Sequence, residues 1–218
     1  MFNKTTHNSS YINLALCSLP LLATLSGCGA TNSEYGIDTQ TRTIRTEIPT
    51  TFVAQAKLIS IGTDMVLKDD NGEFGKVQQR VLNWTKTFEY YDGSNTIKAK
   101  AKQKAFSFGV KIDIVDGNNV AIGSVEEKVF QSIFKIKTSY SIKDPQGIVL
   151  AESEKLDWAG TTVEIKNKSG QVVATMKRPY FDLGAATWNV TINQDPGFDK
   201  RLIIFIPAFK TAADAERD

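Results

Sequence analysis

Apolar and polar residues alternate along most of the chain from Thr51 onward. In residues 134–143 (FKIKTSYSIK) every second position is apolar or threonine, and the positions between them are lysine or serine. Residues 162–166 (TVEIK) and 187–192 (TWNVTI) alternate in the same way. Alternation with a period of two places one kind of residue on each face of a β-strand. The pattern therefore predicts an antiparallel sheet with one buried and one solvated face.

Short clusters of turn-forming residues separate these segments. Asp-Gly and Asn-Gly sequences supply the positive φ angles that tight hairpins require, and each of the six clusters contains one glycine. This is the pattern of about a dozen strands arranged in hairpins. So many strands would leave exposed sheet edges unless the sheet closed, which favours a closed antiparallel barrel. The clusters are DDNG (69–72), YDGSN (91–95), VDGNN (115–119), DPQG (144–147), NKSG (167–170) and NQDPG (193–197).

The C-terminal segment has a different pattern. Residues 202–209 (LIIFIPAF) form an uninterrupted apolar run, and a helix that is apolar on all sides is typical of a protein interior. The dipeptide Asp195-Pro196 supplies a suitable N-cap and first helical residue. The proline within the run removes a backbone donor, so we expect a kink or an early end there. The alternative is a last strand over residues 201–206 and a short surface helix over residues 208–217.

Residues 1–28 have the organisation of a secretory leader. An apolar stretch of twelve residues, 14–25, follows Lys4, and it is too short for a membrane-spanning helix, which needs about 20 residues. The sequence LSGC (25–28) resembles a bacterial lipobox, in which the cysteine becomes the new amino terminus and its sulfur carries a diacylglycerol. The alternative is an ordinary secretory signal that happens to contain Cys28. Gly29 follows where an aspartate would favour the inner membrane, so we expect the outer membrane, facing the periplasm.

These features divide the chain into three segments. Residues 1–27 are the predicted signal peptide, residues 28–50 the lipidated tether and residues 51–218 the barrel domain. As a random coil, the 22 residues that follow Cys28 would span about 25 Å. The alternative for part of the tether is an edge strand at residues 42–48 (RTIRTEI).

The composition of the mature chain removes most kinds of catalysis. Residues 28–218 hold 25 Lys or Arg against 24 Asp or Glu, and they contain no histidine and no cysteine besides Cys28. Such a chain has no disulfide, no Ser-His-Asp triad, no free cysteine nucleophile and no His/Cys zinc site. We therefore expect a protein that is not an enzyme and has no catalytic residues, metal or other cofactor. Glu152 and Glu154 could form a catalytic carboxylate pair, but they alternate with Ser153 and Lys155 as solvated strand positions do.

Three stretches and the C-terminal run follow one another in a specific order. They are AQAKLISIGTDMVLKDDNGEFGKVQQRVL (54–82), KQKAFSFGVKIDIVDGNNVAIGSVEEKVF (102–130), VVATMKRPYFDLGAATWNVTI (172–192) and RLIIFIPAF (201–209). In this order they resemble the tubby C-terminal-like superfamily, above all its LURP-one-related branch, which is also similar to phospholipid scramblases. KAFSFG is similar to that family's recurrent Lys-Phe-Phe-Ser link. Pro207 and the wide spacing between Gly117 and Gly147 depart from the family pattern.

The resemblance implies a mainly β fold, a closed barrel of about 12 strands around a central hydrophobic C-terminal helix. Tubby domains bind phosphoinositide headgroups and scramblases act on phospholipids, whereas the LURP-one-related branch has no settled activity. Phosphoinositides are not expected in a bacterial periplasm, so the resemblance does not name the ligand.

Lysines occupy every second position of residues 98–104 (KAKAKQK). On a strand they share one face, about 7 Å apart, while Ala99, Ala101 and Ala105 face the interior. Residues 80–143 hold eleven Lys or Arg against six Asp or Glu, and anionic lipid attracts each surface lysine by about 1 kcal/mol. The alternative is that these lysines only keep the outer face soluble and block edge pairing. The candidate headgroup-contact residues are Lys98, Lys100, Lys102, Lys104, Lys135 and Lys137.

The sequence therefore favours a lipid-anchored envelope protein whose barrel contacts anionic phospholipid or an envelope partner protein. Nucleic acid is not an expected partner, because the mature net charge is small. The alternatives are a scramblase-like protein that handles phospholipids and a structural scaffold that binds a partner but no small ligand.

Overall fold

The computed structural model describes residues 46–57, 62–82, 85–106, 109–132, 135–154, 156–157, 161–179, 186–193 and 195–215. Residues 42–218 form one compact unit, separate from residues 1–41. The hydrophobic core runs from Phe52 to Ala212, so this unit contains its own core and we expect it to fold by itself. The predicted signal peptide, Cys28 and the tether up to residue 45 lie outside the described residues.

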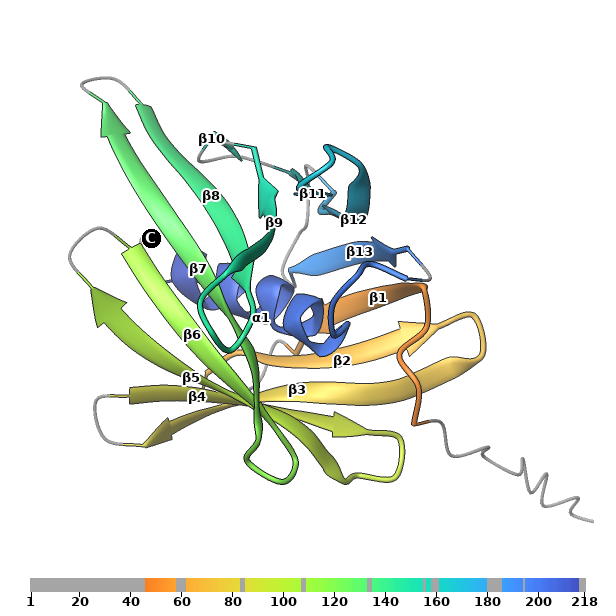
Figure 1. The fold of residues 1–218 in the computed structure, drawn as a ribbon. Coiled ribbons are helices and arrows are strands. Elements are labelled where there is room, and N and C mark those ends of the chain that lie inside the picture. The colour runs from red at the N-terminus through yellow and green to blue at the C-terminus, as the bar shows by residue number, and fades with distance from the viewer. Residues whose placement is uncertain are drawn as a thin grey trace, which may run out of the picture. The chain divides into compact units, whose positions relative to one another are not determined.

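The described residues contain thirteen strands and one helix (Figure 1). Strands β3 to β8 are longer than the strands that precede and follow them. The helix α1, Arg201–Ala215, follows all the strands in the chain. The strands are β1 Thr51–Ala56, β2 Asp64–Asp69, β3 Gly72–Leu82, β4 Thr85–Asp92, β5 Ile97–Phe106, β6 Gly109–Asp116, β7 Ala121–Ser132, β8 Lys135–Lys143, β9 Val149–Ser153, β10 Leu156–Asp157, β11 Thr162–Asn167, β12 Val172–Lys177 and β13 Thr187–Ile192.

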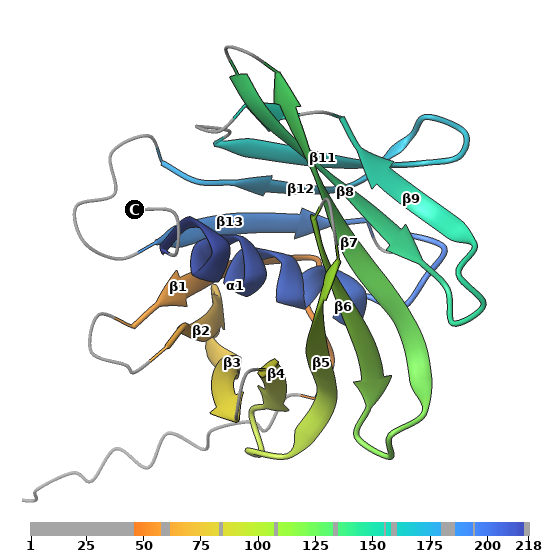
Figure 2. The ribbon, with the colours of Figure 1, turned by 90° about the vertical axis from the view of Figure 1, so that its left-hand side faces the viewer.

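The sheet closes on itself. Each strand from β1 to β8 pairs antiparallel with the next one, and the ring continues from β9 through β11, β12 and β13 back to β1. Twelve strands thus form a closed barrel, while the two-residue β10 pairs only with β8. Helix α1 lies within the ring of strands (Figure 2). The prediction of a closed antiparallel barrel of about 12 strands around a central hydrophobic helix is confirmed.

The alternation of apolar and polar residues in the sequence corresponds to the inner and outer faces of the barrel strands. In β13, Trp188, Val190 and Ile192 are buried, and the intervening Asn189 and Thr191 are exposed. Side chains of opposite parity point to opposite faces of a strand. The apolar positions therefore face α1 and the polar positions face solvent.

Four hairpin loops share one hydrogen-bonding pattern. The side chain of the first loop residue, an Asp or Asn, accepts hydrogen bonds from the backbone N–H groups of the third and fifth residues. The fourth residue has a positive φ: 60° at Asn95, 64° at Asn119, 85° at Gly147 and 81° at Gly170. The loops are 92–96 (DGSNT), 116–120 (DGNNV), 144–148 (DPQGI) and 167–171 (NKSGQ).

Two of the predicted turn glycines, Gly93 and Gly117, do not supply the positive φ of their loops. In the loops that contain Gly93 and Gly117, an asparagine two residues later adopts the positive φ, because Asn tolerates this region better than other residues with a Cβ. Gly117 is required by a close approach instead. A Cβ at this position would lie 2.6 Å from the carbonyl oxygen of Ile97.

All four loops lie at one end of the barrel. Consecutive strands are antiparallel, so the hairpin loops alternate along the chain with links at the opposite end. Strand β13 runs toward the loops, and α1 therefore begins at that end. We call it the turn end and the opposite one the link end.

Helix α1 is buried along most of its length. The nine residues from Leu202 to Lys210 are all buried, and the helix continues through Pro207 to Ala215. The alternative of a last strand and a surface helix is therefore wrong, and the proline does not end the helix. Pro207 cannot donate to the carbonyl of Ile203, but packing on every side keeps the segment helical.

The helix begins later than the sequence predicted. Asp199, and not Asp195, is the N-cap: its Oδ1 accepts from the backbone N–H of Arg201 at 2.9 Å, as N-cap side chains do. Asp195 closes a local turn by accepting from the N–H of Gly197 at 3.0 Å. The Asp-Pro pair therefore belongs to the connection before the helix.

Polar contacts fix α1 at both ends of the barrel. At the turn end, Arg201 donates from Nη1 to the carbonyl oxygen of Lys98 at 2.9 Å. At the link end, Trp188 donates from Nε1 to Oγ1 of Thr211 at 3.1 Å, and Asp214 pairs with Arg178 at 3.1 Å and with the buried Lys210. The helix is therefore held in register with the wall as well as packed inside it.

Residues 46–50 precede β1 without forming a strand. The alternative edge strand over residues 42–48 therefore does not form in its described part, residues 46–48. Ile48 packs partly against the core. The first strand begins at Thr51.

Candidate functional site

Lys98, Lys100, Lys102 and Lys104, which we call the lysine row, lie on β5 and alternate with its buried alanines. Ala99 and Ala101 are completely buried, so the lysines that alternate with them point away from the core. Lys98 and Lys100 are half-buried, whereas Lys102 is exposed. The side chain of Lys104 is 61% exposed. The sequence pattern therefore predicted the face of these four lysines correctly.

The turn-end lysine of the row is neutralised by a buried carboxylate. Lys98 lies 3.1 Å from Oδ2 of Asp92, whose side chain is fully buried. Burial by itself raises the pKa of Asp92, but hydrogen bonds from Ser94 and Thr96 and the contact with Lys98 lower the pKa more, so it lies below its usual value. Asp92 is therefore ionised at neutral pH, and Lys98 is its counterion.

The link-end lysine is also paired. Lys104 contacts Asp113 of β6 at 2.5 Å, and Lys111 contacts the other oxygen of Asp113 at 3.1 Å. Burial raises the pKa of Asp113, and the two lysines lower it more, to a value below the usual one. Two ammonium groups thus share one carboxylate at this position.

Lys100 and Lys102, in the middle of the row, form no ion pair within the described part of the chain. Lys100 lies opposite Glu89 of β4, but Glu89 accepts a hydrogen bond from the hydroxyl of Tyr91 at 2.7 Å and pairs with Arg80 at 3.4 Å. Lys102 lies opposite Asp113 on β6, which is already shared by two other lysines. Two adjacent cations on the outer face of β5 therefore remain available to an external anion.

Lys135 and Lys137 do not belong to the same cluster. They lie on β8, where their backbones pair with Ser132 and Phe130 of β7, and their side chains lie outside the described part of the structure. Strand β8 is three strands away from β5 in the sheet order, which corresponds to about 14 Å. The structure therefore brings together the four lysines of β5 but not all six candidate residues.

The two glutamates considered for catalysis are occupied by other contacts. Glu152 is exposed and accepts from the hydroxyl of Ser141 at 2.8 Å, and Glu154 pairs with Lys166. Both are on the solvated side of the wall, as the alternation indicated. Within the described residues, no group of three or more His, Cys, Asp or Glu side chains is placed to hold a metal ion.

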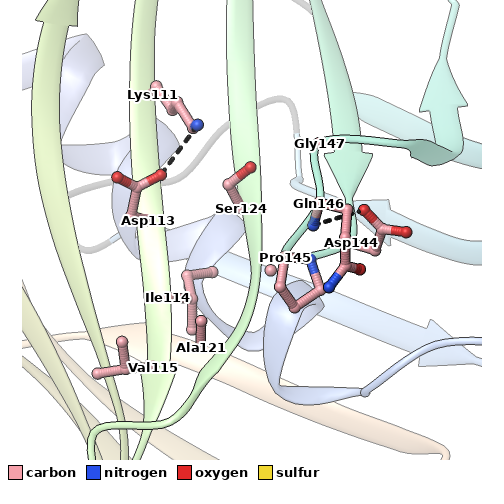
Figure 3. A pocket seen from close by; sticks show the side chains of 11 residues that line it. Lys111, Asp113, Ile114, Val115, Ala121, Ser124, Asp144, Pro145, Gln146 and Gly147 are labelled. Carbon is pink, nitrogen blue, oxygen red and sulfur yellow. Dashed lines mark hydrogen bonds and ion pairs between the residues drawn. The ribbon is translucent and has the colours of Figure 1, made fainter.

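A groove on the outer wall was not foreseen from the sequence. It has a volume of about 400 Å³ and lies between the outer face of β6 and β7 and the loop that joins β8 to β9 (Figure 3). Lys111 and Asp113 line it from β6, Ser124 from β7, and Asp144 and Pro145 from the loop. These residues are brought together only by the pairing of β6, β7 and β8, so no local sequence signal indicates the groove.

None of the helices in the described residues has the length and apolar character needed to cross a membrane.

Comparisons with known proteins identify a family. A family model described as LURP-one-related matches residues 75–207, which is more than half of the chain. A solved structure of a protein from Arabidopsis thaliana is similar, with 16% sequence identity over 76% of this chain and 93% of that chain and a TM-score of 0.38. No curated protein matches the chain at a significant level.

Proposed function

The chain belongs to the LURP-one-related family, and we propose that it is a non-enzymatic, membrane-anchored envelope lipoprotein whose barrel contacts anionic phospholipid through the outer face of β5. The observation that carries the proposal is that Lys100 and Lys102 are adjacent on the outer wall and form no ion pair within the described residues. The proposed anchor is a diacylglycerol on Cys28, and the proposed location is the outer membrane, facing the periplasm.

The strength of such a contact explains why an anchor is needed. Each lysine near an anionic surface contributes about 1 kcal/mol, so two lysines contribute about 2 kcal/mol, a factor of roughly 30 in affinity. Such a contact is weak, but it is measurable at low salt, where the attraction between charges is least screened. Combined with a lipid anchor, the same contact orients the barrel, because two weak membrane signals bind far better than one.

The chemistry of the chain supports a binding role. The LURP-one-related family is not known for enzymatic activity. Residues 28–218 contain no histidine and only the cysteine proposed to be acylated, which removes histidine bases and a free cysteine nucleophile.

The scramblase-like alternative requires α1 to meet lipid. Nine consecutive residues of α1 are buried inside the barrel, and both of its ends are fixed by polar contacts. A fluorescent-lipid flip assay with the protein reconstituted in vesicles tests this alternative. We expect no acceleration of lipid exchange between the leaflets.

The test of the leading proposal is co-sedimentation of residues 42–218 with vesicles that contain phosphatidylglycerol at low salt. The double variant Lys100→Gln/Lys102→Gln is expected to bind about 30-fold more weakly. The control is Lys68→Gln/Lys177→Gln, which removes two exposed lysines from β2 and β12 and changes the net charge equally. Equal losses in the two variants, or no binding by the unsubstituted protein, would contradict the proposal.

A further inference from the structure

The groove beside the β8–β9 loop contains an unused polar group. Ser124 is 4% exposed, and its hydroxyl has no hydrogen-bond partner among the residues that the structure describes. Its side chain lines the groove, as Figure 3 shows. Ser124 Oγ is not among the fully enclosed side-chain atoms that lack a partner, so the hydroxyl is open to the groove, and a ligand atom there would accept its hydrogen bond.

The two sides of the groove carry opposite charge. On the strand side, Lys111 of β6 and the neighbouring Lys104 of β5 share the single carboxylate of Asp113, so this side has an excess of one positive charge. On the loop, Oδ1 of Asp144 accepts from the N–H groups of Gln146 and Ile148 at 2.9 and 2.8 Å, and Oδ2 makes no contact within the described residues. The groove therefore matches a molecule with an anionic and a cationic group.

The rim of the groove is unusually apolar for this type of loop. Val120 and Ile148, which are 61% and 54% exposed, are the fifth residues of the two loops that follow β6 and β8. The equivalent residues of the other two loops are Thr96 and Gln171, both polar. Exposed aliphatic side chains therefore occur only in the two loops next to the groove, within this set of four.

We propose that the groove binds the headgroup of a zwitterionic phospholipid with a primary ammonium, a phosphoethanolamine headgroup. The phosphate lies near Lys111 and Ser124, and the ammonium lies near Oδ2 of Asp144. Val120 and Ile148 then contact the acyl region of the bilayer, and this aliphatic rim selects a lipid over a free zwitterion. The volume of about 400 Å³ is within the range of small-ligand pockets.

This inference rests on the proposed membrane contact, but it concerns a different lipid and a different part of the wall. Attraction of Lys100 and Lys102 to anionic lipid is screened by salt. Recognition in the groove depends on paired groups at short range and on apolar contact, so it persists at higher salt. The two contributions are therefore separable by vesicle composition and by ionic strength.

Asp144→Asn is the most specific variant for the test. Asn167 occupies the equivalent position of the loop after β11 and accepts the same two backbone hydrogen bonds, so asparagine preserves the loop and removes only the charge. Asp116→Asn is the matched control, because Asp116 begins the loop after β6 in the same way but does not line the groove.

The experiment measures co-sedimentation of residues 42–218 with vesicles of phosphatidylcholine alone and with added phosphatidylethanolamine, at physiological salt. We expect the added lipid to strengthen binding about tenfold, and Asp144→Asn to remove this gain while Asp116→Asn keeps it. Val120→Ser/Ile148→Ser is expected to weaken binding to both kinds of vesicle. Circular dichroism confirms that each variant is folded.

Two results would overturn the headgroup proposal. One is equal binding to vesicles with and without phosphatidylethanolamine. The other is competition by soluble phosphoethanolamine or a free amino acid at the same strength in the unsubstituted protein and in Val120→Ser/Ile148→Ser, which would assign the groove to a soluble zwitterion. Neither result changes the outcome with phosphatidylglycerol at low salt, so failure of this inference is distinguishable from failure of the proposed function.

Discussion

The two faces of β5 carry equally regular patterns, but different forces determine them. On the inner face, Ala99 and Ala101 are completely buried in the core that includes α1, so available space determines their size. On the outer face, Lys98 and Lys104 have carboxylate partners, whereas Lys100 and Lys102 have none among the described residues. Packing in the core therefore determines which residues fit on the inner face. On the outer face, the contacts between described residues leave the two middle lysines available for binding.

The largest effect is expected on the inner side, where α1 fills the barrel. Phe205 is completely buried, so Phe205→Ala removes apolar contacts and leaves a cavity. We expect a loss of about 3–5 kcal/mol in the free energy of unfolding, measured by urea titration. A loss below about 1 kcal/mol would mean that α1 contributes little to the core.

A smaller loss is expected from overpacking the same face. Ala101→Leu introduces three carbon atoms where no space exists, and we expect a loss of about 1–3 kcal/mol. Lys102→Leu places the same side chain on the outer face one residue away and serves as the control. If the two variants were equally stable, the inner face of β5 would not be restricted by packing.

The ion pair of Lys98 predicts a dependence of stability on pH. The pKa of Asp92 lies below its usual value of 3.8 in the folded protein, so the ionised group stabilises the fold above that pH, and this contribution is lost as pH falls through the folded pKa. Asp92→Asn keeps the loop acceptor but removes the charge. We expect the free energy of unfolding to fall by about 1 kcal/mol at pH 7. Below pH 4, it should decline less steeply than in the unsubstituted protein, and Asp116→Asn is the control.

The smallest effect on stability is expected where binding is proposed. Lys100→Gln/Lys102→Gln should change the free energy of unfolding by less than about 0.5 kcal/mol while weakening binding to anionic vesicles. Both quantities are measured on the same preparation. A larger loss of stability would show that these lysines support the fold, and the vesicle result would then need a different interpretation.

Period-two alternation and turn residues were sufficient to predict the barrel and the outward direction of the lysines. The start of α1 was predicted wrongly, because Asp195 and Asp199 are both plausible caps and only the position of the wall selects between them. The ion pair between Asp92 and Lys98 was not predicted, because Lys98 is the extra residue of a bulge opposite Tyr90 and Tyr91, and the alternation of the sequence does not indicate this bulge. The groove is lined by residues of β6, β7 and the β8–β9 loop, and these residues are close together because of the register of the strands, which the sequence pattern does not indicate.

The position of α1 in the chain has a consequence for how the protein is made. All thirteen described strands precede the helix that supplies ten of the buried residues. A growing chain therefore has a wall with nothing to enclose until the helix itself has been synthesised. We expect the earlier strands to remain open to chaperones and proteases during this interval, so that slow folding has its greatest cost before α1 is in place.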